Sequence, residues 1–335
     1  MNVTPVLSVE GLGVEFRTRS GIVHALENVS FAVGKSETIA IVGESGSGKS
    51  VTAYAVMGIL DPAGRVTAGR AMLGDLDLLA SDRGELAGVR GRKIAMIFQN
   101  PRTALNPIRP VGRQIADVLI RHAGVTHRAA PAAAVEMLRE VGITDPVRRA
   151  KSYPFEMSGG MCQRVMIAIA LAAKPLLLIA DEPTTGLDVT TQAVIMDLIG
   201  ELAAQFGMAT IFITHDLALA AQRAARIVVM HAGHVVETAP TKELFANPRH
   251  PYTAELIAAT PDAAISLEAL ASVPGSLPDL RCADLPPCRY SERCSRKTEH
   301  CAKPLPQTRA GDRHVVACWN PLPKQPIGVS SASAA

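Results

Sequence analysis

The fold of this chain is decided by the stretch Thr38-Ile-Ala-Ile-Val-Gly43-Glu-Ser-Gly-Ser-Gly48-Lys49-Ser50. Its apolar start predicts a short buried strand, and the residues from Val51 onward predict the start of a helix. A strand and a helix joined by the pattern Gly-x4-Gly-Lys-Ser are the context of a phosphate-binding loop. Glycines let consecutive backbone N–H groups surround an anion, and the helix N-terminus adds partial positive charge. The alternative for the isolated pattern is a flexible Gly/Ser turn with a chance lysine.

The end of this loop carries the groups that a nucleotide with Mg²⁺ needs. The ammonium of Lys49 can lie between the β- and γ-phosphates, and the hydroxyl of Ser50 can bind Mg²⁺. A second apolar run, residues 176–180, predicts a central parallel strand and ends on Asp181-Glu182. Ligands bind at that end of the strands in open α/β sheets. We therefore expect Asp181 to hold Mg²⁺ and Glu182 to polarise the attacking water, the alternative being a solvated strand end.

Further polar or aromatic residues stand at the ends of other predicted strands. Gln99 ends the strand 93–99, and His215 ends the strand 210–215. Each can contact a bound ligand, or can simply cap the element that follows. Phe16, on a strand ahead of the phosphate loop, can stack on adenine or face the core.

The middle of the chain is predicted to be helical. Residues 111–120 and 129–141 have helical apolar spacing, and Gly142 ends the second helix. Ser158-Gly159-Gly160 precedes a further helix, where Ser158 takes the N-cap position. This is either an ordinary capped helix or a second anion site. Before the phosphate loop, short runs at 6–9, 14–16, 25–26 and 29–33 predict strands of an antiparallel sheet.

Composition limits the class of protein. The 335 residues, of which 48% are hydrophobic, fit one large domain or two, and a net charge of +3 is too small to indicate nucleic-acid binding. No secretory signal pattern is present, and the apolar run 165–173 is shorter than the ~20 residues that span a bilayer. We expect a cytosolic protein without disulfides, whose membrane role comes through a partner.

Over about residues 5–240 the chain resembles the nucleotide-binding subunit of ABC transporters. The resemblance rests on six elements in this order: the phosphate loop, Gln99, Ser158-Gly-Gly, Asp181-Glu182, Leu187-Asp188 and His215. Several segments resemble the dipeptide/oligopeptide importer branch, and most of all the first of its two ATPase subunits. These segments are Asn106-Pro107, Met157-Ser-Gly-Gly-Met161, Ala180-Asp-Glu-Pro-Thr-Thr-Gly-Leu-Asp188 and Asn247-Pro-Arg-His-Pro-Tyr-Thr253.

The resemblance implies a site for ATP and Mg²⁺ and a role for each matching residue. In the chain's own site it implies that Phe16 stacks on adenine, that Gln99 senses Mg²⁺ and the attacking water, and that His215 is the switch histidine. The Walker B pair is Asp181 and Glu182, and the Walker A loop consists of Gly43, Glu44, Ser45, Gly46, Ser47, Gly48, Lys49 and Ser50. For the dimer it implies that Ser158, Gly159 and Gly160 contact the γ-phosphate of ATP on a partner subunit and that Asp188 lies in the loop that crosses the interface. Met161 departs from the family, whose signature has Gln there, and Met cannot donate a hydrogen bond.

The C-terminal part carries a set of cysteines. After predicted helices at 241–245 and 251–259 and a Pro-rich linker at 274–287, the cysteines follow as Cys288-x5-Cys294-x6-Cys301-x16-Cys318. Such a cluster predicts a metal site, although the paired C-x2-C of common zinc sites is absent. The resemblance implies a [4Fe–4S] cluster on these cysteines, with zinc or free thiols as alternatives. The basic residues among them, Arg289, Arg293, Arg296 and Lys297, can offset its negative charge.

The fold class predicted is α/β: a P-loop ATPase core with a parallel sheet, an antiparallel β subdomain, a helical subdomain and a small irregular C-terminal extension. The predicted divisions are an ABC-type nucleotide-binding domain at 1–240 with its helical subdomain at about 100–172, a C-terminal extension at 241–323, and a disordered tail at 324–335.

The predicted function is that of an ATP-hydrolysing subunit of a membrane importer for peptides or a similar small solute. The implied partners are a second, paralogous ATPase subunit, two transmembrane permease subunits and, indirectly, an extracytoplasmic solute-binding protein, but no nucleic acid. The predicted location is the cytoplasmic face of the inner membrane. One alternative is a soluble ABC-type ATPase acting on ribosomes or DNA, and another is a redox sensor built on the cysteines. The sequence does not identify the solute.

Overall fold

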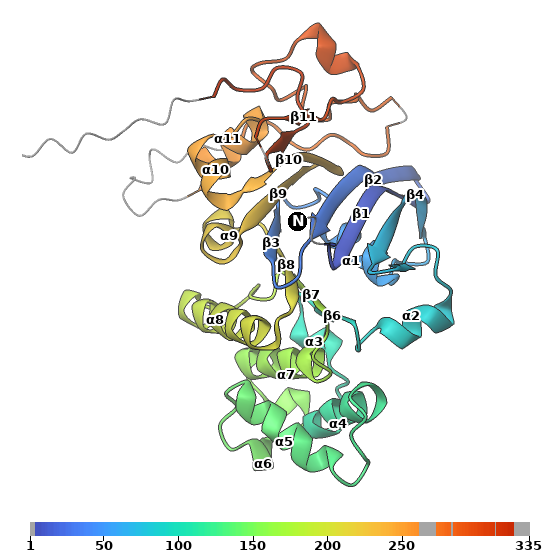
Figure 1. The fold of residues 1–335 in the computed structure, drawn as a ribbon, viewed down its shortest axis with the longest axis vertical. Coiled ribbons are helices and arrows are strands. Elements are labelled where there is room, and N and C mark those ends of the chain that lie inside the picture. The colour runs from blue at the N-terminus through green and yellow to red at the C-terminus, as the bar shows by residue number, and fades with distance from the viewer. Residues whose placement is uncertain (1–3, 261–272, 283, 312, 325–335) are drawn as a thin grey trace, which may run out of the picture.

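The computed structural model describes residues 4–260, 273–282, 284–311 and 313–324 (Figure 1). Its strands form two sheets, one of eight strands in the order β11-β12-β10-β9-β3-β8-β7-β6 and one of four in the order β2-β1-β4-β5. In the larger sheet, β9, β3, β8, β7 and β6 run parallel to one another. This arrangement confirms the predicted parallel sheet and antiparallel subdomain. The bounds of the larger sheet are β3 Thr38–Val42, β6 Ile94–Ile97, β7 Leu177–Asp181, β8 Ala209–Thr214, β9 Arg226–His231, β10 His234–Pro240, β11 Thr308–Arg309 and β12 Val315–Val316.

The antiparallel sheet consists of β1 Leu7–Thr18, β2 Gly21–Val33, β4 Gly64–Leu73 and β5 Leu76–Asp77. The short separate strands predicted before the phosphate loop are wrong, because they merge into the two long strands β1 and β2. Register shifts between Val9 and Val14 interrupt the pairing without ending the strands. Gly11 and Asn28 take left-handed φ values of 62° and 52° near these shifts, which is typical of bulges.

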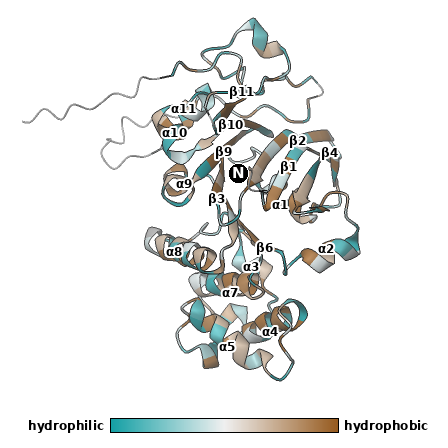
Figure 2. Cartoon of the chain, in the orientation of Figure 1, coloured by the Kyte–Doolittle hydropathy of each residue, from teal (hydrophilic) through white to brown (hydrophobic). Residues whose placement is uncertain are grey.

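The parallel sheet is buried on both faces, which explains its unbroken apolar strands. Ile39 and Ile41 belong to a core shared with α1 (Lys49–Met57) and the antiparallel sheet. Ala40 and Val42 belong to a second core that includes side chains of α7, α8 and α9. The strands are accordingly brown in Figure 2, whereas the helix surfaces alternate between brown and teal. The helices on this second face are α7 Gly159–Leu171, α8 Val189–Phe206 and α9 Leu217–Arg223.

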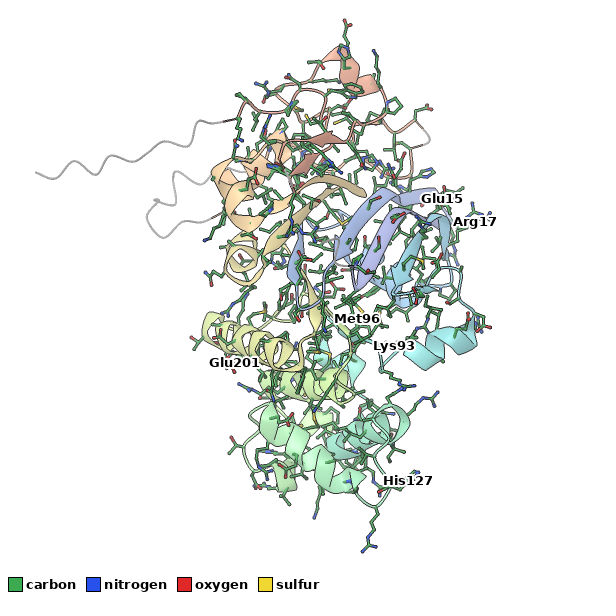
Figure 3. All side chains as sticks on the ribbon, in the orientation of Figure 1. Glu15, Arg17, Lys93, Met96, His127 and Glu201 are labelled. Carbon is green, nitrogen blue, oxygen red and sulfur yellow. The ribbon has the colours of Figure 1, made fainter. Side chains whose placement is uncertain are left out.

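The predicted helical subdomain forms a separate group of helices at the bottom of Figure 1, with His127 near its far end in Figure 3. Its elements are α3 Pro101–Ala104, α4 Val111–His122, α5 Ala130–Glu140, α6 Pro146–Arg149 and the short 3-10 turn η1 Pro154–Glu156, with α7 joining it to the sheet. The predicted ends of α4 and α5 are correct to within two residues. Gly142, which was predicted to end α5, has a left-handed φ of 71° just beyond it. The helix α2 Arg83–Val89 lies beside the antiparallel sheet.

The C-terminal extension packs against the end of the large sheet. It contributes α10 Thr241–Ala246, α11 Pro251–Ala258, the turn η3 Glu299–Ala302 and the strands β11 and β12. Val316 of β12 pairs with Glu237 of β10, so the extension continues the sheet of the nucleotide-binding domain. The description of 274–287 as a linker is wrong for its described part, because Leu280 accepts a backbone hydrogen bond from His24 of β2.

The predicted disordered tail lies, except for Lys324, outside the described residues. None of the described helices is both long and apolar enough to cross a membrane.

Candidate functional site

Eight of the predicted site residues line one cleft of about 370 Å³ at the C-terminal ends of the parallel strands. The predicted residues that line it are Phe16, Ser45, Gly46, Gly48, Lys49, Ser50, Gln99 and Glu182. Sequence reasoning missed four apolar residues of its wall, namely Val23, Ala25, Val51 and Leu280. The cleft therefore has a polar end at the phosphate loop and an apolar end beside Phe16.

The phosphate loop requires glycine at Gly43 and Gly48. Gly43 has φ +152°, and a Cβ there would lie 2.1 Å from the carbonyl oxygen of Met230. Gly48 has φ +100°, and a Cβ would lie 2.6 Å from the side chain of Leu26. Any other residue at these positions would force the backbone to move. The loop thus leads directly from β3 into the N-terminus of α1, which is the position where an anion site is expected.

Lys49 lies at the base of this loop, largely buried. Its ammonium donates hydrogen bonds to the carbonyl oxygens of Gly43 and Glu44, each at 2.9 Å. Burial lowers the pKa of Lys49, and the nearby carboxylates of Glu182 and Asp181 partly oppose that shift. The ammonium is therefore held at the point where the phosphate groups of a nucleotide would place negative charge.

Ser50 and Asp181 form the part of the cleft that fits Mg²⁺. The hydroxyl of Ser50 donates to Oδ1 of Asp181 at 2.9 Å. The other oxygen of Asp181, Oδ2, is buried and has no hydrogen-bond partner among the described residues. Burial raises the pKa of Asp181, and the charge of Glu182 adds to this effect. A hydroxyl and a buried carboxylate with a free oxygen are donors that Mg²⁺ accepts, so these residues fit the ion.

Glu182 is the centre of a hydrogen-bond network at the strand ends. Its Oε2 accepts from Nε2 of Gln99 at 2.8 Å and from the hydroxyl of Thr185 at 3.0 Å, and its Oε1 lies 3.1 Å from Nδ1 of His215. Burial acts to raise the pKa of Glu182. The hydrogen bonds from His215 and Thr185 and the charge of Lys49 outweigh the effect of burial, so the pKa of Glu182 is lowered. The carboxylate is therefore charged at neutral pH, as a base must be.

The backbone of Glu182 is strained, with a φ of +44°. A left-handed conformation is uncommon for a residue other than glycine, and it costs free energy that the surrounding structure must offset. Such strain is concentrated at functional sites, which agrees with the position of Glu182 at the cleft.

Two groups of predicted site residues lie outside this cleft. Ser158 caps α7 by accepting a hydrogen bond from the N–H of Met161 at 3.3 Å. Asp188 caps α8 through the N–H and hydroxyl of Thr191, at 2.9 and 2.7 Å. The start of α7 lies near that of α8, since a Cβ on Gly160 would be 3.5 Å from Thr191. These residues form a separate exposed surface rather than part of the chain's own cleft.

The predicted cysteine set is brought together in the extension. Burial raises the pKa of Cys288 and of Cys318 to about 11, and in both cases the neighbouring thiols of the set add to the shift. Cys294 and Cys301 act on both groups, so the four thiols lie close enough for their charges to interact. No group of three or more His, Cys, Asp or Glu in the described ranges is placed to hold a metal ion. The structure thus gathers the thiols without itself supporting an iron–sulfur cluster or zinc.

Two of the basic residues among the cysteines differ from expectation, whereas the charge of Arg296 acts to lower the pKa of Cys294 and of Cys318, as predicted. Arg289 pairs with Glu27 of β2, and Arg293 pairs with Glu44 of the phosphate loop. Both arginines are therefore committed to the nucleotide-binding domain rather than to the thiols. The contact with Glu44 could not be found from the sequence, because the two residues are 249 positions apart.

Comparison with known proteins agrees with this geometry. Family models match as "ABC transporter" over residues 26–185 and as "Oligopeptide/dipeptide transporter, C-terminal region" over residues 236–301. The dipeptide transport ATP-binding protein DppD of Bacillus subtilis (strain 168) is 45% identical over 316 residues, which cover 94% of each chain. The oligopeptide transport ATP-binding protein OppD of the same strain is 49% identical over 282 residues, covering 84% of this chain and 79% of the relative.

A solved structure shows the same fold. The dimeric ATP-binding cassette MJ0796, bound to ADP and Pi in a post-hydrolysis state, matches with a TM-score of 0.63 and 28% identity. The match covers 70% of this chain and 98% of that one.

A phosphate loop, a carboxylate pair and a capped signature helix on this mixed sheet define an ATP-hydrolysing cassette of the ABC class. More particularly, the chain belongs to the family of ABC transporter ATP-binding subunits that carry the oligopeptide/dipeptide transporter C-terminal region.

Proposed function

We propose that this chain hydrolyses ATP to power a membrane importer of dipeptides, oligopeptides or a similar small solute. The observation that carries the proposal is the cleft in which the phosphate loop faces Glu182 and its partners Gln99 and His215. The transport of peptides is inferred from the names of the relatives, which are dipeptide and oligopeptide transport proteins.

In this proposal each end of the cleft binds a different part of ATP. Phe16 stacks on the adenine, while the N–H groups of residues 43–50 and the ammonium of Lys49 hold the phosphates. Ser50 and Asp181 would hold Mg²⁺, which would neutralise phosphate charge. Glu182 accepts the proton of the attacking water, and its lowered pKa keeps it ionised for this task. Gln99 and His215 orient Glu182 and the γ-phosphate.

We place Ser158, Gly159, Gly160 and Asp188 at the site of a second subunit. Ser158 and Asp188 are exposed, Gly159 and Gly160 are partly exposed, and none of the four lines the chain's own cleft. The first N–H groups of a helix have no partner within the helix, so the N-terminus of α7 suits a phosphate. A head-to-tail pair of cassettes would therefore build each ATP site from two chains. We propose a paralogous subunit as the partner, with Met161 leaving the phosphate contact to the serine and the glycine N–H groups.

The rest of the assembly follows from transport. We propose that two permease subunits hold the chain at the cytoplasmic face of the inner membrane and that an extracytoplasmic protein delivers the solute. The helices at residues 100–172, and especially the loop from Gln99 to Pro107, would contact the permeases. We also propose the division into a nucleotide-binding domain at 1–240, an extension at 241–323 and a tail at 324–335.

We propose a [4Fe–4S] cluster on Cys288, Cys294, Cys301 and Cys318. Four thiols that influence one another's pKa are the required donor set, and the N–H of Thr298 already points to the sulfur of Cys301 at 3.5 Å. When bound, the cluster would cross-link the segments of the extension. Iron and acid-labile sulfide analysis on protein purified without oxygen tests this: equal amounts of both support it, and zinc or no metal refutes it.

Uptake of a labelled dipeptide by cells that lack the gene tests the transport function. Restoration by the wild-type chain but not by Glu182→Gln supports the proposal. Unchanged uptake without the gene, together with co-sedimentation of the chain with ribosomes, would instead favour a soluble ABC-type ATPase.

A further inference from the structure

The described segment 273–282 of the C-terminal extension lies against the nucleotide cleft. Leu280 lines the cleft together with Phe16 and Val23 of the antiparallel sheet. Its carbonyl oxygen accepts a hydrogen bond from the N–H of His24 at 2.9 Å, which fixes it to the edge of β2. A methyl group of Leu277 lies 3.3 Å from the position of a Cβ on Gly46 in the phosphate loop. The segment therefore follows the cleft from its apolar end to its phosphate end.

Arg293 holds this segment in place. Its Nε donates to the carbonyl oxygen of Pro274 at 2.6 Å, and its two terminal nitrogens donate to the carboxylate of Glu44 at 2.7 and 2.9 Å. The Arg293 side chain is only 4% exposed. One planar guanidinium thus joins the segment to the phosphate loop, and its fixed geometry restricts the position of both.

Leu280 meets the part of the cleft that is chemically suited to a nucleobase. Its neighbours there are Phe16, Val23 and Ala25, whereas Lys49 and Ser50 lie at the other end. Leu280 is half-buried, so part of its side chain still faces the cleft. An apolar side chain in that place loses contact with water when a flat heteroaromatic ring covers it, which favours binding.

We propose that Leu280 is a nucleotide-binding residue, which closes the nucleobase end of the ATP site opposite the phosphate loop, and that Arg293 is its positioning residue. The proposal rests on the assignment of this cleft as the ATP site. It gives the C-terminal extension a direct part in binding ATP, in addition to any role of its cysteines.

Calorimetric titration of the full-length chain with ATP and with inorganic tripolyphosphate tests the proposal. Leu280→Ala should weaken ATP binding about fivefold and leave tripolyphosphate binding unchanged, because only ATP carries a base. Leu280→Met, which keeps the apolar volume, should restore ATP affinity. Leu285→Ala is the matched control, since Leu285 is equally half-buried in the extension but does not line this cleft.

The outcomes separate the proposal from the assignment beneath it. Unchanged ATP affinity in Leu280→Ala, or equal losses for ATP and tripolyphosphate, would overturn the role of Leu280. Failure of the wild-type chain to bind ATP would instead overturn the assignment of the cleft. The variant Arg293→Ala should weaken ATP binding, and adding Leu280→Ala should weaken it no further; an additive loss would overturn the positioning role of Arg293.

Discussion

Both terminal nitrogens of Arg293 donate to the carboxylate of Glu44, at 2.7 and 2.9 Å, which ties the C-terminal extension to the phosphate loop. The backbone N–H of Glu44 also donates to the hydroxyl of Tyr252 on α11, at 3.0 Å. His231 lies 3.6 Å from the same carboxylate. The loop that binds the phosphates is therefore supported from behind by residues outside the sequence motif that defines it.

The ion pair between Arg293 and Glu44 should contribute to stability. Because the pair is largely buried but Glu44 keeps some exposure, a double-mutant cycle with alanine at both positions should give a coupling free energy of about 1–2 kcal/mol at pH 7. The exposed pair of Arg70 with Glu10 is the matched control, and its coupling should be too small to distinguish from zero because water and salt screen it. Urea unfolding measures both, and additive effects at Arg293 and Glu44 would contradict the account.

The same pair predicts a pH dependence. Burial raises the pKa of Glu44, but His231 and Arg293 outweigh this effect and lower the pKa from its ordinary value of 4.5 to about 2. A carboxyl whose pKa is lower in the folded state stabilises that state above its unfolded pKa. The coupling should therefore persist at pH 6 and disappear as the pH falls from about 4.5 to about 2. A coupling that is constant across this range would be inconsistent with the ion pair.

The variant Asp181→Asn should stabilise the folded chain and at the same time weaken its binding of Mg²⁺ with ATP. Burial raises the pKa of Asp181 in the folded chain above the ordinary pKa of an aspartate. The ionised carboxylate therefore lowers the free energy of unfolding once the pH exceeds that ordinary pKa, and the loss is complete above the raised pKa. The amide variant should therefore unfold at a higher temperature than wild type at pH 7 without nucleotide. It should lose at least about tenfold in affinity for Mg²⁺ with ATP. Thermal unfolding with and without Mg²⁺–ATP measures both effects, and an unchanged shift on adding Mg²⁺–ATP would exclude Asp181 from the ion site.

Ser158→Arg should affect the assembled transporter but not the isolated chain. Ser158 is exposed at the start of α7 and does not line the chain's own cleft. ATP binding by the isolated chain should therefore stay within about twofold of wild type, whereas ATP turnover of the complex should fall about tenfold or more, because the arginine would occupy the phosphate position of the partner's site. Loss of ATP binding by the isolated chain would contradict the assignment of Ser158 to the ATP site of the partner subunit.

The sequence predicts the catalytic end of the cleft because its residues follow neighbouring parallel strands. Gln99, Glu182 and His215 come after β6, β7 and β8, which are adjacent in the sheet, so their side chains must meet at one edge. The phosphate loop is equally local, since its conformation depends on its own glycines. The apolar strand patterns and the motifs thus predict which residues stand at strand ends, and the structure adds the order that brings these ends together.

The apolar end of the cleft could not be predicted in this way. Leu280 reaches the cleft, and Arg293 reaches Glu44 of the phosphate loop, from stretches without regular secondary structure, which have no periodicity to interpret. The long strands β1 and β2 were missed for a different reason, because the strands continue through the left-handed residues Gly11 and Asn28, which interrupt the apolar pattern and are accommodated near bulges. Both errors come from tertiary contacts that outweigh local signals.

Turnover and binding of ATP by Glu182→Gln test the central claim most directly. Measured on the assembled complex, the variant should bind ATP within about twofold of wild type, and its hydrolysis should fall at least about 100-fold, because the amide cannot accept the proton of water. Glu201→Gln, on the exposed face of α8 (Figure 3), is the control and should hydrolyse ATP at the wild-type rate. Undiminished hydrolysis by Glu182→Gln would contradict the account.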